Sequence, residues 1–300
     1  MRGHIALALV MASSVACGRS PTAPSLGNHS LIVNGLPRTY SLHVPASFQP
    51  HTGSLVIALH GAGGSGTQFE QQTGLTALAD LRGFAIAYPD GLYNPALRAS
   101  DWQTFGNDFT DDISFLHALI ASMSVETQSD AHRVYIAGFS DGGRLAHRAG
   151  AELSDQIAAI GDVGGSLFQG DGSSVSPARG PVSILILHGD GDAYCGKAGD
   201  ASQDQTFNYW LSHDACAVPD TATPLCDASG SPTDVIEKSA TECRGGVELR
   251  FYKFAGGGHA WYPGVLNVPG QLPYNASLNA TTGTTINDIL WTFFAAHAKQ

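Results

Sequence analysis

The sequence carries little charge, and most of that charge is acidic. Charged residues make up only 14% of the 300 residues, and 26 Asp and Glu against 15 Lys and Arg give a formal net charge of −11. Proteins that bind the phosphate backbone of nucleic acids usually have a basic surface patch. The composition therefore argues against a nucleic-acid partner.

Cysteine is also scarce, and the five cysteines lack paired C-x-x-C spacing, which argues against a zinc site. The stretch "DGDAYCGKAGD" (190–200) resembles a calcium-binding loop. However, Tyr194 and Cys195 stand where the fifth ligand and the obligatory glycine of such a loop would be. The sequence predicts no metal and no cofactor.

Long apolar runs are absent after residue 20, where nothing approaches the roughly 18 apolar residues of a membrane-spanning helix. The N-terminus differs, because "MRGHIALALVMASSVAC" has a basic tip, an apolar stretch and small residues before a cysteine. This pattern predicts a secretory signal peptide over residues 1–17. The segment Ser14–Ala16 suits ordinary cleavage, and before Cys17 it also resembles a bacterial lipobox, in which Cys17 would be lipidated and attached to a membrane.

The chain that follows the signal divides into a flexible tether over residues 18–29 and one folded domain over residues 30–300. Cleavage within the tether is an alternative. Once Cys17 is set aside, an even number of cysteines remains, and they can pair in an oxidising compartment with three connectivities: Cys195, Cys216, Cys226 and Cys243. We expect a bacterial monomer that is secreted, periplasmic or held at the cell surface.

Apolar runs of strand length alternate with helical patterns along the domain. After a hairpin signal at Asn34-Gly35, the expected strands are "SLVIALHG", "GFAIAYPDG", "HRVYIAGFS", "IAAIGDVGG", "VSILILHGDGD" and "VELRFYKF". Helical patterns cover residues 67–82, 111–126 and 141–153, and "TINDILWTFFAAHAK" is an amphipathic tail. This order predicts an α/β fold with a mostly parallel central sheet and helices on both faces. Functional sites of such sheets lie at the carboxyl ends of the strands.

One such strand end carries the pattern G-x-S-x-G, here Gly138-Phe139-Ser140-Asp141-Gly142. The expected strand ends just before Ser140 and the expected helix opens just after it, so the backbone must reverse in a strained turn with small neighbours. This is the pattern of a nucleophile elbow, which exposes a serine hydroxyl beside a helix N-terminus. We predict that Ser140 is a catalytic nucleophile.

A serine nucleophile needs a histidine base, and the histidine needs a carboxylate to hold its tautomer. In the order serine, acid, histidine, we predict Asp192 as the acid, with Asp190 and Asp162 as alternatives. The predicted base is His259, in the glycine-rich loop "FAGGGHAWYPG" after the last strand. His147 and His297 lie on helices with apolar neighbours and are interpreted as packing residues, and His188 is expected to shape the acid loop.

The loop "LHGAGGSG" matches the dinucleotide-binding pattern G-x-G-x-x-G, but it follows a hairpin and is led by His60. A hydrolase needs a similar loop to bind the oxyanion of a tetrahedral intermediate through backbone N–H groups. We favour this second interpretation, with the N–H groups of Ala62 and Asp141 as donors. Trp102 and Trp261 are candidate walls of a substrate pocket, with core packing as the alternative.

Taken together, "LHGAGG", "YPDG", "DDISFL", "RVYIAGFSDGG", "HGDGD" and "GGGHAWYPG" resemble secreted esterases of the polyhydroxybutyrate depolymerase and feruloyl esterase type, in the α/β-hydrolase superfamily. The resemblance covers roughly residues 30–295. It implies an α/β-hydrolase fold, the roles given above for Ser140, Asp192 and His259, and a disulfide between Cys216 and Cys243. Cys195 and Cys226 would then form a second pair. The insertion of Tyr262 after Trp261 departs from the usual histidine motif of the group.

The sequence thus predicts a secreted carboxylic ester hydrolase that works through an acyl-enzyme, on feruloyl or other aryl, acetyl or hydroxyalkanoate esters, polyesters included. Two other hypotheses remain open. One is a serine peptidase on the same fold, and the other is a catalytically inactive, lipid-anchored binding protein.

Overall fold

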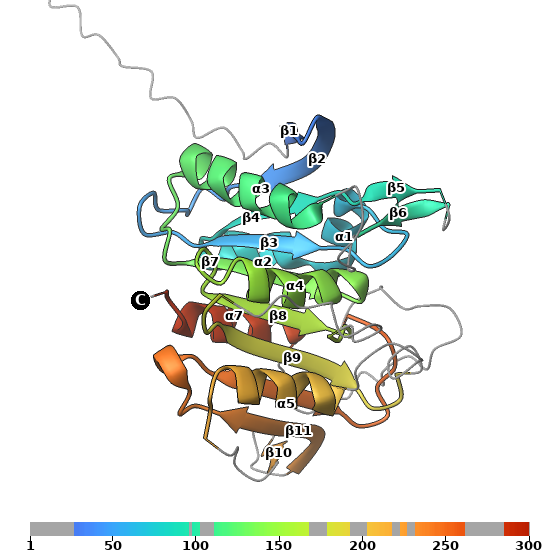
Figure 1. Cartoon of the computed structure of the whole chain (residues 1–300), viewed down its shortest axis with the longest axis vertical. Helices are drawn as coiled ribbons and strands as arrows, with labels where there is room; N and C mark the ends of the chain where they lie inside the picture. Colours follow the sequence, from blue (N-terminus) through green and yellow to red (C-terminus); the bar gives the residue numbers. More distant parts are fainter. Residues whose placement is uncertain are drawn as a thin grey trace, which may run out of the picture.

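The computed structural model describes residues 27–95, 98–102, 111–167, 179–192, 203–217, 223–226, 232–261 and 285–299 (Figure 1). The strands in these ranges are β1 (Gly27–Val33), β2 (Leu36–His43), β3 (Leu55–Leu59), β4 (Ala85–Pro89), β5 (Leu92–Asn94), β6 (Ala99–Asp101), β7 (Val134–Phe139), β8 (Ala159–Val163), β9 (Ser183–Gly189), β10 (Thr223–Cys226), β11 (Pro232–Ala240) and β12 (Leu249–Phe254). The helices are α1 (Gly66–Thr73), α2 (Leu75–Arg82), α3 (Asp112–Thr127), α4 (Asp141–Glu152), α5 (Gln203–His213) and α7 (Ile286–Ala296), with a short 3₁₀ turn at Arg244–Gly246.

The main sheet has ten strands in the order β1-β2-β4-β3-β7-β8-β9-β12-β11-β10. Its centre, from β4 to β12, is parallel. Antiparallel strands extend it on both sides, namely the β1–β2 hairpin next to β4 and the strands β11 and β10 next to β12. The predicted fold class, a mostly parallel sheet with helices, is confirmed.

Both faces of the sheet are covered by helices (Figure 1). Side chains from one face, such as those of Leu55 and Ile57, pack with residues of α3, α4 and α5 in one core cluster. Alternate side chains of the same strand, such as that of Val56, pack with residues of α1, α2 and α7 in the other. Because β3, β4, β7 and β9 are buried along their whole length, they read in the sequence as continuous apolar runs.

The structure differs from the sequence-based prediction in several places. The single helix expected over 67–82 is divided at Gly74, whose left-handed φ of 69° ends α1 and begins α2. Strand β1 begins at Gly27, inside the predicted tether, because its backbone pairs with β2 from that residue onward. The small β5–β6 hairpin, the strands β10 and β11 and the helix α5 were not predicted. The proposed signal peptide lies outside the described residues.

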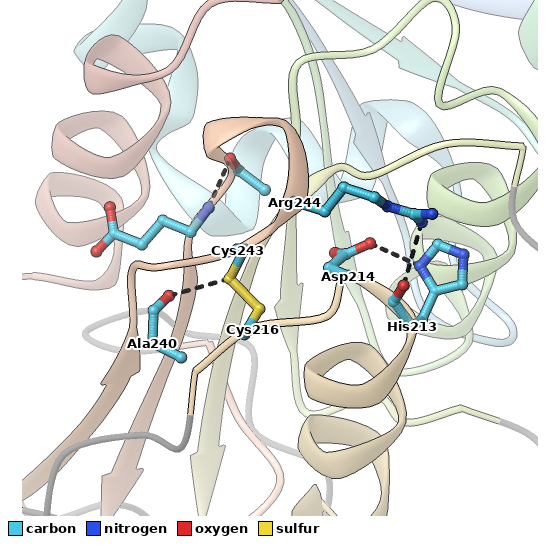
Figure 2. Close-up of a disulfide and its surroundings, with 8 residues drawn as sticks. His213, Asp214, Cys216, Ala240, Cys243 and Arg244 are labelled. Carbon is cyan, nitrogen blue, oxygen red and sulfur yellow. Dashed lines mark hydrogen bonds and ion pairs between the residues drawn. A yellow bond between two sulfur atoms is a disulfide. The ribbon is translucent and has the colours of Figure 1, made fainter.

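A disulfide joins Cys216, just after α5, to Cys243, just after β11 (Figure 2). This is the pair that the family resemblance implied. Beside it, the backbone N–H of Arg244 donates to the carbonyl oxygen of Asp214 at 2.7 Å, and the ring of His213 contacts the Asp214 carboxyl group at 2.6 Å. The bridge thus fixes the end of α5 against the turn that leads into β12. The other predicted pair falls on Cys195 and on the side chain of Cys226, which are outside the described residues.

Removing this disulfide should destabilise the fold without changing the chemistry. The two cysteines are 27 positions apart, and closing a loop of this size restricts the unfolded chain enough to contribute about 3–4 kcal/mol. We expect the double variant Cys216→Ser/Cys243→Ser to lose about this much unfolding free energy in urea titrations at 25 °C. Its kcat should stay within about twofold of the wild type while it is folded. An unchanged denaturation midpoint would contradict the prediction.

Within the residues that the structure describes, no helix combines the length and apolar character needed to cross a membrane. The same residues contain no group of three or more His, Cys, Asp or Glu side chains suited to holding a metal ion.

Candidate active site

Ser140 occupies the turn between β7 and α4, with φ 56° and ψ −117°. Non-glycine residues avoid this combination, and strain of this kind is found mainly at functional sites. The turn is held because the Ser140 N–H donates to the carbonyl oxygen of Val163 on β8 at 3.0 Å, while the Ser140 carbonyl accepts the N–H of Arg144 at 3.0 Å. The elbow that the G-x-S-x-G pattern predicted is therefore present in the backbone.

The glycines of the pattern are required by close backbone contacts. A Cβ atom on Gly138 would lie 2.0 Å from the carbonyl oxygen of Gly142, so the end of β7 and the first turn of α4 can approach only without side chains. A Cβ atom on Gly142 would lie 2.3 Å from the carbonyl oxygen of Leu59, at the end of β3. These contacts bring Ser140 next to the loop that follows β3.

The structure brings Ser140, Asp192 and His259 together. His259 Nδ1 lies 2.7 Å from Asp192 Oδ2, and His259 Nε2 lies 2.9 Å from Ser140 Oγ. Because a carboxylate only accepts hydrogen bonds, the Nδ1 hydrogen of His259 is donated to Asp192, and Nε2 is left to accept the serine hydroxyl. The three residues follow β7, β9 and β12, and β9 and β12 are neighbours in the sheet.

Neither of the alternative acids contacts His259. Asp190 accepts the backbone N–H of Gly256 at 2.6 Å, and Gly191 donates its N–H to the carbonyl oxygen of Gly257 at 2.8 Å. The loops after β9 and β12 are thus joined by hydrogen bonds next to Asp192. Asp162 instead contacts His147 Nε2 at 3.0 Å within the core.

The imidazole of His259 is enclosed by small and aromatic neighbours. Its ring lies 4.8 Å from the ring of Phe139, the residue before the elbow serine, and only 4% of the histidine is exposed. A Cβ atom on Gly164 would lie 3.2 Å from His259 Nδ1, so glycine leaves the room that the ring needs. The Asp192 side chain is 1% exposed, and the His188 ring lies 3.4 Å from the same carboxylate oxygen that contacts His259.

The loop after β3 lies beside the elbow, because a Cβ atom on Gly61 would be 3.3 Å from the Cβ of Ser140. Gly64 donates its N–H to the carbonyl oxygen of Gly61 at 3.1 Å, and Gly63 donates to the carbonyl oxygen of Ser100 at 2.7 Å. No backbone acceptor for the Ala62 N–H occurs in the part of the chain that the structure describes. The Asp141 N–H belongs to the first turn of α4, where helix N–H groups have no intrahelical partner.

The same loop contains the G-x-G-x-x-G pattern, but the acidic residue after the next strand, Asp90, forms hydrogen bonds within the protein. Asp90 accepts the N–H of Gly66, at the start of α1, at 2.8 Å, and the hydroxyl of Thr39 at 2.7 Å. A carboxylate bound to the N-terminus of α1 takes the place where a dinucleotide fold would bind phosphate. This contact favours the oxyanion interpretation over the cofactor interpretation.

The two candidate tryptophans are buried, in agreement with the packing alternative. Trp102 is 3% exposed, and its indole N–H donates to the carbonyl oxygen of His60 at 2.7 Å. Trp261 is 1% exposed, and its N–H donates to the side-chain oxygen of Asn287 at 2.8 Å. In the described residues both indoles pack in the core, which favours the packing alternative over that of a pocket wall.

Sequence reasoning missed the role of His60, which the strand pattern marked only as the residue before the glycine loop. His60 is buried, its Nδ1 lies 2.7 Å from the Gly61 carbonyl oxygen, and its Nε2 accepts the N–H of Gly91 at 3.0 Å. Its ring also packs on Trp102, at 4.6 Å. His60 therefore links the loop after β3 to the start of the β5–β6 hairpin.

Burial lowers the pKa of His60 and of His188 below the ordinary histidine value of 6.5. Below pH 6.5 the unfolded chain binds protons that these folded histidines do not, so stability is lost as the pH falls, by up to about 1.4 kcal/mol per pH unit for each group. In His188→Gln, the amide can keep the contacts with Gly189 and Gln203 but cannot titrate.

We therefore expect the unfolding free energy of His188→Gln to decline less than that of the wild type between pH 7.5 and 5.5, measured by urea titration at each pH. His51→Gln, at an exposed histidine far from the site, is the matched control. Parallel pH profiles for His188→Gln and the wild type would contradict the prediction.

Comparison with known proteins identifies the class. Residues 38–182 match the family described as esterase PHB depolymerase. Feruloyl esterase B of Piromyces equi is 31% identical over 222 residues, which cover 69% of this chain but only 39% of that protein. NocK of Nocardia uniformis subsp. tsuyamanensis, described only provisionally as an esterase, is 25% identical over 94% of this chain and 93% of its own length.

Among solved structures, the acetyl xylan esterase from Aspergillus awamori superposes with a TM-score of 0.62, covering 90% of this chain and 99% of that one, at 14% identity. At this identity the likeness concerns the fold. The chain is an esterase with the α/β-hydrolase fold. Within this class it resembles the polyhydroxybutyrate depolymerase and feruloyl esterase group, as the sequence motifs predicted.

Proposed function

We propose that the protein is a secreted carboxylic ester hydrolase that uses Ser140, His259 and Asp192 as a catalytic triad. The observation that carries the proposal is the continuous chain of contacts from Asp192 Oδ2 through the His259 ring to Ser140 Oγ, at 2.7 and 2.9 Å. The strained elbow and the backbone N–H groups beside it support the same assignment.

In the acylation step, His259 Nε2 takes the hydroxyl proton of Ser140 as Oγ bonds to the ester carbonyl carbon. The negative charge that develops on the carbonyl oxygen is stabilised by the N–H groups of Ala62 and Asp141, and the imidazolium by Asp192. When the tetrahedral intermediate collapses, the carbon–oxygen bond to the alcohol breaks. The leaving alcohol then receives the proton from Nε2.

In the deacylation step, water attacks the acyl-enzyme and gives a proton to His259 Nε2. The bond to Ser140 Oγ then breaks, the serine regains the proton, and the free acid leaves. In both steps the protons move only between Ser140, His259, the leaving alcohol and the attacking water, and no redox change is needed.

The substrate class proposed is a feruloyl or other aryl ester, an acetyl ester or a hydroxyalkanoate ester, including polyesters. Relatives named as feruloyl esterases and the superposed acetyl xylan esterase support the first two, and the family match supports the third. Secretion through the N-terminal signal fits a chain that contains a disulfide, because disulfides form in oxidising compartments. Attachment to a membrane through a lipidated Cys17 is an alternative form of the same proposal.

The test is a panel of substrates scored by kcat/KM, containing methyl ferulate, p-nitrophenyl acetate, acetylated xylan, short hydroxybutyrate oligomers and the matching amides. We expect hydrolysis of one or more esters and rates on the amides that are lower by orders of magnitude. Labelling with a fluorophosphonate probe should modify Ser140. A folded protein that neither forms the adduct nor hydrolyses any ester is instead the binding protein of the third hypothesis.

A further inference from the structure

A second buried carboxylate lies directly behind the proposed triad. Asp162, on β8, is fully buried. Its Oδ1 accepts the backbone N–H of Gly165 at 2.7 Å, and its Oδ2 contacts His147 Nε2 at 3.0 Å. A buried carboxylate is costly unless it is hydrogen-bonded in this way, and nothing in the catalytic steps above uses it.

The partner of His147 on its other side fixes the direction of these hydrogen bonds. The indole N–H of Trp210, on α5, lies 3.0 Å from His147 Nδ1. Tryptophan can only donate, so Nδ1 accepts, and the ring hydrogen of His147 is on Nε2, where it is donated to Asp162. The result is a directed chain from Trp210 through His147 to Asp162, in which all three side chains are fully buried.

This chain ends at the turn that supports the reacting groups. The Asp162–Gly165 contact closes the segment 162–165, in which the Val163 carbonyl accepts the Ser140 N–H. The next residue, Gly164, has a left-handed φ of 67° and lies against the His259 ring.

The carboxylate also touches the helix that begins at the elbow. A Cβ atom on Gly143 would lie 2.1 Å from Asp162 Oδ1, and His147 is on the same helix, one turn later. Asp162 therefore contacts the first turn of α4, which directly follows Ser140. It also contacts the turn 162–165, which packs against His259.

We propose that Asp162 and His147 are positioning residues for ester hydrolysis, which set the distance between Ser140 and His259 through the directed hydrogen-bond chain from Trp210. The proposal rests on the proposed function. A 1 Å displacement of reacting groups can lower a rate by about 10²-fold. The direction of the chain separates this role from simple core packing, because it predicts which isosteric substitutions are tolerated.

Asp162→Asn keeps the shape but brings a donor where only acceptors fit. If the oxygen of the introduced amide keeps the Gly165 N–H, the amide hydrogens face the Nε2 hydrogen of His147. If the ring hydrogen of His147 moves to Nδ1 instead, that hydrogen faces the indole N–H of Trp210, which can only donate. We expect kcat to fall by about 10²-fold with KM within about threefold, when kcat is expressed per site titrated with a fluorophosphonate.

Three further variants test the direction of the chain. His147→Gln offers an oxygen to Trp210 and an N–H to Asp162, so its kcat should stay within about threefold of the wild type, whereas His147→Leu should resemble Asp162→Asn. Adding Trp210→Phe to Asp162→Asn removes the opposing donor and should restore about tenfold of the lost kcat. A packing role does not predict that a second core substitution restores activity.

The outcomes are distinguishable from failure of the proposed function. If the wild type hydrolyses esters, Ser140→Ala does not, and Asp162→Asn loses only thermal stability with normal kcat per titrated site, the positioning proposal alone is overturned. It is also overturned if His147→Gln is as impaired as His147→Leu. If Asp162→Asn does not fold, the comparison of kcat between His147→Gln and His147→Leu decides the positioning proposal. If the wild type shows neither hydrolysis nor labelling, the proposed function and the positioning proposal fail together.

Discussion

Replacing Ser140 with alanine should lower the rate of p-nitrophenyl ester hydrolysis by about 10⁴-fold or more, while the protein folds normally. The reason is that Oγ, which lies 2.9 Å from His259 Nε2, supplies the bond of the proposed acyl-enzyme, and alanine has no atom that can replace it. The measurement is kcat with the purified variant, together with circular dichroism to confirm folding. A fully active Ser140→Ala variant would falsify the triad assignment.

A matched pair of variants separates chemistry from backbone strain. Ser140→Gly should be as inactive as Ser140→Ala, but alanine keeps the unfavourable φ of 56° and glycine relieves it. We expect the glycine variant to be more stable than the alanine variant by about 1 kcal/mol, after the greater freedom of glycine in the unfolded chain is included. Ser47→Ala, at an exposed serine, is the control for activity.

Replacing Asp192 with asparagine should lower kcat by about 10³–10⁴-fold. The carboxylate accepts the Nδ1 hydrogen of His259, whereas the asparagine amide can present a donor there and favour the tautomer in which Nε2 carries the hydrogen. That tautomer cannot take the proton of Ser140. The decisive measurement is the ratio of kcat between the variant and the wild type at pH 8, with the fluorophosphonate labelling rate as a second readout.

The control is Asp190→Asn in the same loop. Its side-chain oxygen can still accept the Gly256 N–H, so we expect kcat to fall less than tenfold. This pair resolves the choice that the sequence left open between the two carboxylates. If Asp190→Asn proves the more damaging change, the assignment of the acid is wrong.

Much of the fold was predictable because the central strands are buried on both faces. The runs that form β3, β4, β7 and β9 are continuous and are each followed within two residues by glycine or aspartate, and those signals need no tertiary information. Ser140 was predictable for a similar reason, since the close contacts of Gly138 and Gly142 impose a local sequence pattern. Chain order then limited the acid and the base to a few candidates.

Other features depend on contacts between distant segments and leave no local pattern. His147 looked like a packing residue on a helix, because its partners Asp162 and Trp210 are 15 and 63 positions away. The exposure of Trp102 and Trp261 likewise depends on the elements that cover them. The division of the helix at Gly74 was missed because a single glycine is tolerated within many helices.

The interlocked loops after β9 and β12 have a consequence for how this scaffold can diversify. The Asp190–Gly256 and Gly191–Gly257 contacts use backbone groups of the histidine loop, so they do not depend on which side chains line a substrate pocket. The proposed acid Asp192 and the proposed base His259 therefore lie on two loops that are held together by their own hydrogen bonds. If the triad proposal holds, insertions elsewhere along the rim of the sheet change the substrate pocket without disturbing the contacts that join these two loops.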